Sequence, residues 1–252
     1  QDNPYLMQTE DYYIMLASLP EVQRKQFLEG DWGAYEDAAF PEFNKGVHVL
    51  TPFEIPKNWH RFRACDWGYS SPACVLWFAI DFDNNLYVYR ELYTKKVVAD
   101  QFAYQVLNME NREYIRYRIL DSSTWAKRGD VGPSIAETMI NAGCRWRPSD
   151  RSPRSRINGK LELHKRLSVR ETNNGEKPSL FIFENCLNLI RTLPLLPCDK
   201  NNPEDVDTHT EDHAYDALRY GCMSRPINPH GTGYSSFDKG SQFKPADRMF
   251  GY

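Results

Sequence analysis

The sequence lacks the features that mark membrane proteins and proteins held together by disulfides. It has no run of about 18 apolar residues, and no basic segment followed by an apolar one at its N-terminus, so we predict neither a transmembrane helix nor a secretory signal. Its six cysteines include no C-x-x-C pair and are spread through apolar segments. This spacing predicts reduced, structural thiols and not a disulfide framework or a zinc site. We therefore expect an intracellular protein.

The sequence also lacks a nucleotide-binding loop and a strong excess of charge of one sign. No G-x-x-x-x-G-K-[ST] occurs, and the nearest stretch, Asn158 to Leu161, lacks both the first glycine and the hydroxyl residue. ATP hydrolysis is therefore not expected of this fragment. The formal net charge of -3 provides no overall attraction to nucleic acid, although a local group of cations still can.

What the sequence does contain is enough apolar material for a large core, with 41% hydrophobic residues. Three segments rich in β-branched and aromatic residues predict strands at 61–68, 73–81 and 85–93. A turn signal, Asp83-Asn84-Asn85, separates the last two. These segments predict an antiparallel meander.

Helices and strands alternate after the meander. Apolar spacing predicts helices at 97–110, 133–143 and 185–195, and short apolar runs predict strands at 117–123 and 180–183. The segment Thr210 to Gly221 (TEDHAYDALRYG) predicts a last helix, and Glu211, three residues after Thr208, fits a capping box. The order predicts an α/β fold in which helices pack on a mixed sheet. Before the meander, 10–29 predicts two short helices, followed by an irregular linker.

Carboxylates stand at unusual places in three of these elements. Asp66 interrupts an apolar strand, and Asp121 closes another. Asp212 and Asp216 are four residues apart and share one helical face, with His213 on its flank. A strand seldom holds an unpaired carboxylate, because burial of its charge costs several kcal/mol. Oxygen ligands of this kind suit Mg²⁺ or Mn²⁺, and two such ions about 4 Å apart stabilise the entering and leaving oxygens of a phosphodiester displacement.

Each carboxylate also has a structural interpretation. Asp121 can cap the loop that follows its strand, and the last helix can present Asp212, Asp216 and Arg219 on a solvated face. His213 alone is more often a packed or surface histidine than a ligand. The order of the motifs, and not any single residue, therefore carries the functional hypothesis.

That order resembles the nuclease domain of phage terminase large subunits. The motifs are C-D-W-G on a strand, a hairpin, a strand ending in L-D-S, and E-D-H-A-Y-D-A-L-R-Y on a late helix. The segment LPEVQRKQFLEGDW, 19–32, is similar to the family's connection between its motor domain and its nuclease. One departure is the sequence DSSTWAKR after the second aspartate, where many relatives carry a further acidic residue.

The resemblance implies an RNase H-like mixed sheet with helices on both faces, plus a short helical N-terminal segment. It implies a linker at 1–58 joining to an ATPase domain absent from this fragment, a nuclease domain at 59–225 and an extended tail at 226–252. The family's catalytic and metal-binding aspartates fall on Asp66, Asp121 and Asp216, with Asp212 and His213 as accessory ligands. The expected cofactors are two Mg²⁺ or Mn²⁺ ions. The expected partners are double-stranded DNA, the portal protein and the small terminase subunit, in the host cell cytoplasm.

A basic stretch between 145 and 170 supplies the local cations. Neutralisation of DNA phosphates is the functional interpretation, and an ordinary solvated surface is the alternative. The residues expected to contact DNA are Arg151, Arg154, Arg156, Lys160, Lys165 and Arg166.

Two other functions remain open from the sequence. One is a different RNase H-like nuclease, such as a junction resolvase or a transposase-type enzyme. The other is a module without catalytic activity that docks DNA or a portal and whose carboxylates are solvated.

Overall fold

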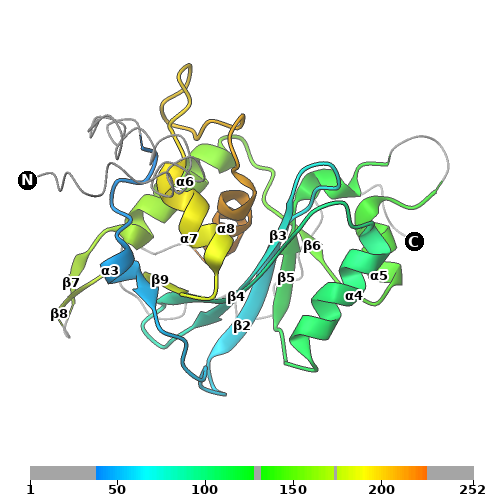
Figure 1. The fold of residues 1–252 in the computed structure, drawn as a ribbon, viewed down its shortest axis with the longest axis horizontal. Coiled ribbons are helices and arrows are strands. Elements are labelled where there is room, and N and C mark those ends of the chain that lie inside the picture. Colours follow the sequence, from blue (N-terminus) through cyan, green and yellow to red (C-terminus); the bar gives the residue numbers. More distant parts are fainter. Residues whose placement is uncertain (1–37, 128–131, 173–174, 226–252) are drawn as a thin grey trace, which may run out of the picture.

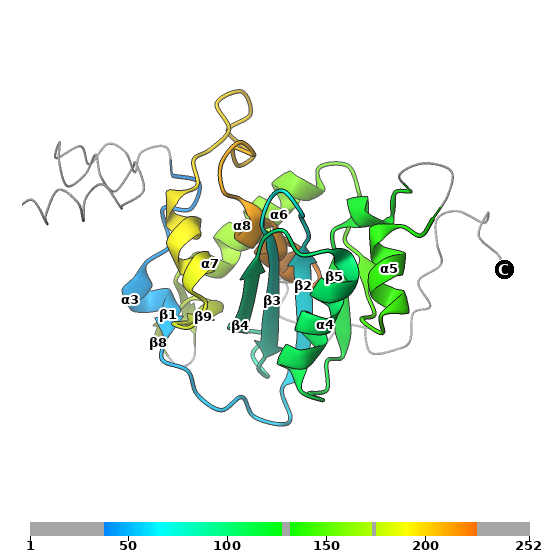
Figure 2. The same ribbon diagram turned by 45° about the vertical axis from the view of Figure 1, so that its right-hand side comes forward.

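The computed structural model describes residues 38–127, 132–172 and 175–225 (Figure 1). The two helices expected within 10–29 and the tail expected at 226–252 lie outside these ranges. Within them, a mixed sheet runs through the middle of the molecule and helices cover both of its faces (Figures 1 and 2). This arrangement confirms the fold class expected from the sequence.

The central sheet has seven strands in the order β1-β9-β4-β3-β2-β5-β6. The predicted meander forms its middle, since β3 pairs antiparallel with both β2 and β4. The other neighbouring pairs are parallel. The strands are β1 (Val49–Leu50), β2 (His60–Asp66), β3 (Ala73–Ile80), β4 (Leu86–Thr94), β5 (Tyr117–Leu120), β6 (Arg147–Pro148) and β9 (Leu180–Phe183). A separate hairpin consists of β7 (Arg170–Thr172) and β8 (Gly175–Lys177).

The described helices include every one predicted for this part of the chain, each within a few residues of its expected bounds. They are α3 (Lys45–His48), α4 (Ala99–Glu110), α5 (Ile135–Asn141), α6 (Ser155–Leu167), α7 (Leu187–Thr192) and α8 (His213–Met223), with 3₁₀ turns η3 (Ser122–Trp125) and η4 (Leu193–Leu195). A capping box opens α5, where Ser134 and Glu137 exchange hydrogen bonds. The capping box expected for the last helix is wrong, because Asp212 is its N-cap and Glu211 pairs with Arg191 on the surface.

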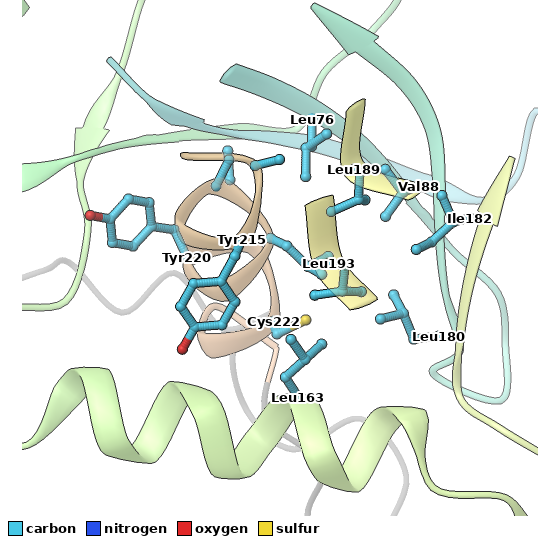
Figure 3. Close-up of a cluster of buried hydrophobic side chains, with 14 of the residues drawn as sticks. Leu76, Val88, Leu163, Leu180, Ile182, Leu189, Leu193, Tyr215, Tyr220 and Cys222 are labelled. Carbon is cyan, nitrogen blue, oxygen red and sulfur yellow. The ribbon is translucent and has the colours of Figure 1, made fainter. Parts of the chain in front are cut away.

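Strand β3 explains why helices pack on both faces of the sheet. All eight of its residues are buried, and successive side chains of a strand point to opposite faces. Leu76 and Phe78 therefore join one core with α6, α7 and α8, whereas Val75 and Trp77 join a second core with α4 and α5. Figure 3 shows the first core, in which side chains of α8 and α7 lie between the sheet and α6.

Part of the segment expected to be a linker belongs to the folded unit. Phe40 is 2% exposed and packs against Tyr215. Strand β1 adds to the edge of the sheet by pairing with β9, with Val49 opposite Ile182. The folded unit therefore includes residues of the segment 38–58. Sequence periodicity could not indicate this, because the strand has two residues and its partner is more than 130 positions away.

Two expectations about the chain's chemistry can be compared with the described residues. All six cysteines are free, and all but Cys198 are buried, in agreement with a structural role. No helix in the described ranges is long and apolar enough to cross a membrane.

Candidate functional site

The site begins where two parallel neighbours in the sheet end. Asp66 is the last residue of β2, and Asp121 directly follows β5. The two strands are in register up to Cys65 and Leu120, and the Asp121 amide donates to the Cys65 carbonyl at 3.0 Å. Neighbouring strands lie roughly 4.8 Å apart, so the pairing brings two carboxylates, 55 positions apart in sequence, side by side.

Helix α8 brings the remaining predicted residues to the same end of the sheet. It packs on β2, β3 and β5, with its N-terminus at the strand ends (Figure 1). Asp212 is its N-cap, and the Asp216 amide donates to the Asp212 carbonyl at 2.8 Å. His213 lies in the first turn, with Nδ1 at 3.0 Å from Asp66 Oδ2. All five residues predicted to form the site therefore lie around the N-terminus of α8.

The contact between His213 and Asp66 holds a proton in the site. Burial raises the pKa of Asp66 to about 6, an effect that the hydrogen bond from His213 partly offsets and the charges of Asp216 and Asp121 reinforce. The hydrogen bond to Asp66 raises the pKa of His213 above its ordinary value. A protonated His213 stabilises an ionised Asp66 beside it, because the two charges are opposite.

Asp212 is a second buried carboxylate whose ionised form is destabilised by its surroundings. It is 7% exposed, and burial together with the nearby charge of Asp216 raises its pKa to about 6. Asp212 makes no side-chain cap hydrogen bond within α8. A cation next to it would relieve both effects, because each one disfavours the charged carboxylate.

Two arginines hold the carboxylate of Asp216. Arg219 Nε and Nη2 each lie 2.9 Å from Asp216 Oδ1, and Arg156 Nη1 reaches both carboxylate oxygens at 3.2 and 3.3 Å. Arg156 is also bound by Asp205, whose Oδ2 accepts from Nε at 2.9 Å. Asp205 was not predicted, since it lies in the loop Asn201 to Asp207, where nothing in the sequence pattern distinguishes it.

The structure corrects the interpretation of Arg219 as a surface residue. Its exposed fraction is 3%, because α6 crosses α8 closely at this point. A Cβ atom on Gly159 of α6 would lie only 2.4 Å from Arg219 Cγ, so only glycine leaves room for this side chain. The spacing Asp216-x-x-Arg219, one helical turn, was the signal that could have predicted the pair.

Asp121 has the capping role that was weighed against a metal-binding role. Its side chain accepts from the Ser123 amide at 3.2 Å and from the Ser123 hydroxyl, and so caps η3. Tyr220 of α8 also donates to Asp121 Oδ1, at 3.3 Å. A carboxylate has about four acceptor positions, so these contacts leave capacity for a further ligand.

The basic stretch divides into exposed and buried members. Arg151, Arg154 and Lys165 are exposed, and Arg156 is partly exposed. The DNA-contacting role predicted for Lys160 and Arg166 is wrong, because they are 5% and 0% exposed. Lys160 donates to the carbonyls of Pro203 and Asp205, and Arg166 donates to carbonyls including those of Asn84 and Arg225. Their charges stabilise internal loops.

The donor set has the chemistry of a hard-cation site, although it is not assembled as one. Asp66, Asp121, Asp212 and Asp216 supply carboxylate oxygens, the ligands that Mg²⁺ and Mn²⁺ prefer. As they stand, no three histidine, cysteine, aspartate or glutamate side chains of the described ranges are grouped to hold a metal ion. The arginines explain part of this, because they occupy Asp216.

Comparison with solved structures identifies the fold. The nuclease domain of the P22 large terminase matches with a TM-score of 0.59 and 20% identity, over 75% of this chain and 92% of that domain. The chain has the large-terminase nuclease fold. The large terminase nuclease of thermophilic phage G20c matches with a TM-score of 0.55 and 11% identity, over 76% of this chain and all of that one. This fold is RNase H-like, as expected.

Longer and metal-bound relatives share the large-terminase nuclease fold. A large terminase from another thermophilic bacteriophage, in complex with ADP, matches with a TM-score of 0.57 and 14% identity, and the chain spans about half of its length, 52%. The match covers 87% of this chain. A G20c nuclease structure with bound cobalt matches with a TM-score of 0.53 and 11% identity, over 74% of this chain and 97% of that one. Neither protein-family models nor curated proteins match the sequence.

Proposed function

We propose that the chain is a metal-dependent DNA endonuclease, the nuclease domain of a phage DNA-packaging terminase large subunit. The observation that carries this proposal is the meeting of Asp66, Asp121 and the first turn of α8 at one end of a sheet with the large-terminase nuclease fold. The proposed substrate is concatemeric double-stranded DNA. The ATPase domain of the same chain, the portal protein and the small terminase subunit are the proposed partners, in the host cell cytoplasm.

The proposed cofactors are two Mg²⁺ or Mn²⁺ ions held by Asp66, Asp121 and Asp216, with Asp212 as an accessory ligand. The cobalt-bound G20c nuclease supports the use of a divalent ion by this fold. When bound, two such ions supply a nucleophilic hydroxide and neutralise charge on the leaving oxygen.

The other residues of the site hold these ligands in place. His213 orients Asp66 through their 3.0 Å contact and keeps a proton at Nδ1. Arg219 fixes Asp216 from inside the domain, since it is buried and donates twice to one oxygen. Arg156 reaches Asp216 from α6 and is more exposed, at 31% of its side chain, so it is the partner that a cation displaces more easily.

Plasmid cleavage by Asp66→Asn tests the proposal. In Mg²⁺ or Mn²⁺ the parent is expected to cut the plasmid, and the variant is expected to lose activity by roughly three orders of magnitude, because the amide keeps the shape but not the charge. Asp83→Asn is the matched control, since the Asp83 side chain is 68% exposed and pairs with Lys177 at 3.8 Å.

Three results would count against the proposal. Equal cleavage by the parent and by Asp66→Asn would remove the carboxylates from the reaction. A strong preference for four-way junctions over plain duplex would favour a resolvase. A parent that binds DNA but does not cut it in either metal would favour a docking module.

A further inference from the structure

A cavity of about 190 Å³ lies at the opposite end of α8 from the carboxylates. Its walls come from three elements that meet there: the start of β5, the edge strand β6 and the residues that follow α8. We call it the basic pocket. Its lining residues are Arg116, Tyr117, Arg147, Ser224 and Arg225.

An aromatic ring and two guanidinium groups form the centre of the basic pocket. The guanidinium carbon of Arg147 lies 4.2 Å from the centre of the Tyr117 ring, and that of Arg225 lies 5.5 Å away. Tyr117 accepts from Arg225 Nε at 3.0 Å and shares a 3.1 Å hydrogen bond with Ser224. The ring itself stacks on Phe62 in the core, which fixes its position.

The described lining of the basic pocket is cationic. The lining contains three arginines and no carboxylate, and in the described ranges neither Arg147 nor Arg225 forms a salt bridge with one. Arg116 contacts His60. The C-terminal dipole of α8 supplies only about half a negative charge. The pocket therefore has the composition of an anion site, and an arginine fork matches the oxygens of a phosphate group.

The edge of the sheet connects the basic pocket to the carboxylates. Tyr117 begins β5 and Asp121 directly follows it, and four residues of a strand span roughly 13 Å. Arg147 of β6 lies opposite Ile119, and the Ser149 hydroxyl just beyond it accepts from the Ser122 amide, next to Asp121. Duplex DNA rises about 3.4 Å per step, so this span corresponds to roughly four base pairs.

We propose that the basic pocket binds a backbone phosphate of double-stranded DNA and anchors the duplex roughly four base pairs from the carboxylates. This inference rests on the proposed function, because it assumes that the substrate is DNA. The contact reads the backbone and not the bases, since the pocket offers guanidinium and hydroxyl donors to phosphate oxygens. Two of the pocket's arginines, Arg116 and Arg225, lie outside the basic stretch of 145–170.

Binding of a labelled duplex of about 20 base pairs, followed by fluorescence anisotropy in EDTA, tests the inference. The whole 252-residue chain is used with Asp66→Asn as the background, so that cleavage does not enter. Arg147→Gln is expected to weaken binding by up to about tenfold near 100 mM salt, and to reduce the salt slope of log K by about 1. Lys45→Gln is the matched control, because Lys45 is exposed beside β1, at the opposite edge of the sheet.

The outcomes separate this inference from its alternatives. A salt slope equal to that of the background overturns it, and if Arg147→Gln lowers the melting temperature, Arg225→Gln replaces it in the same assay. If inorganic phosphate raises the melting temperature of the background protein but not of Arg147→Gln, while DNA binding is the same in both, the pocket binds free phosphate. That result also overturns the inference. If Arg147→Gln leaves DNA binding unchanged while cleavage still depends on Asp66, only the role of the pocket is refuted. If Arg147→Gln weakens DNA binding while cleavage does not depend on Asp66, only the proposed nuclease activity is refuted.

Discussion

The two ends of helix α8 hold opposite charges, and the contacts that the described residues make at the two ends differ. At the N-terminal end, Asp216 is bound by Arg156 and Arg219. At the C-terminal end, Arg147 and Arg225 contact the ring of Tyr117 and form no salt bridge with a described carboxylate. Both arrangements agree with the helix dipole, which favours carboxylates at the N-terminus and cations at the C-terminus.

This difference predicts different requirements for binding at the two ends. A cation at the carboxylate end has to compete with guanidinium groups that already occupy Asp216. A phosphate in the basic pocket meets Arg147 and Arg225, which form no salt bridge with a carboxylate in the described part of the chain. We therefore expect the carboxylate end to control turnover and the basic pocket to control affinity for DNA.

The largest expected effect comes from Asp216→Asn. Cleavage should fall by roughly three orders of magnitude, because the amide cannot hold a hard cation and no longer pairs with two guanidinium groups. Asp212→Asn should reduce the rate less, because Asp212 lies one turn earlier and is proposed only as an accessory ligand. Its Oδ2 is 3.9 Å from Arg156 Nη2. Single-turnover plasmid cleavage measures both, and equal rates for Asp216→Asn and the parent would mean that this helix carries only structural residues.

The next effect is expected from Arg219→Ala. Removal of a buried partner leaves Asp216 with Arg156 alone and should lower the free energy of unfolding by about 3 kcal/mol. Cleavage should fall by roughly tenfold to a hundredfold, as for residues that orient a metal ligand. Urea unfolding and cleavage assays measure the two losses. Arg219→Lys should restore most of the stability but not the rate, because an ammonium cannot reproduce the two contacts to Asp216.

A smaller effect of opposite sign is expected from Arg156→Gln. Removal of the more exposed guanidinium group frees Asp216 to bind a cation, so the Mn²⁺ concentration that half-saturates the increase in melting temperature should fall several-fold. Arg154→Gln is the control, since Arg154 is exposed two residues earlier and forms no ion pair within the described part of the chain. An unchanged Mn²⁺ dependence in Arg156→Gln would show that this arginine does not compete with the metal.

The smallest expected effect on the reaction comes from Arg147→Gln. Its KM for DNA should rise by roughly threefold to tenfold with kcat unchanged, because an anchoring contact that is equal in the ground and transition states affects only binding. Steady-state cleavage at several DNA concentrations measures the split. A loss confined to kcat would contradict the expectation that the basic pocket controls affinity for DNA and the carboxylate end controls turnover.

The sequence predicted the centre of the fold well, because strong local patterns produced it. The meander of β2, β3 and β4 has apolar runs bounded by turns, and the odd position of Asp66 at the end of such a run drew attention to the proposed site. The N-terminus of α8 was found in the same way, from Asp212 and Asp216 at helical spacing.

The wrong predictions for α6 and Arg219 concern side chains whose burial depends on contacts between distant parts of the chain that a single sequence does not show. Helix α6 was taken for a basic stretch because its buried face includes Lys160, Glu162 and Arg166, which interrupt the apolar period. Those side chains are stabilised by partners far away in sequence, such as Pro203 and Asn84. The closeness of α6 and α8 at Gly159, which buries Arg219, likewise depends on packing between helices.

Diffraction from crystals soaked in Mn²⁺ tests the central claim most directly. We expect anomalous density within coordinating distance of carboxylate oxygens of both Asp66 and Asp121, about 2.0–2.3 Å away, and expect Arg156 to have moved off Asp216. The same soak of Asp66→Asn should lose this density. A fully occupied Mn²⁺ elsewhere on the surface, with Asp216 still bound by both arginines and no density beside Asp66, would contradict the account.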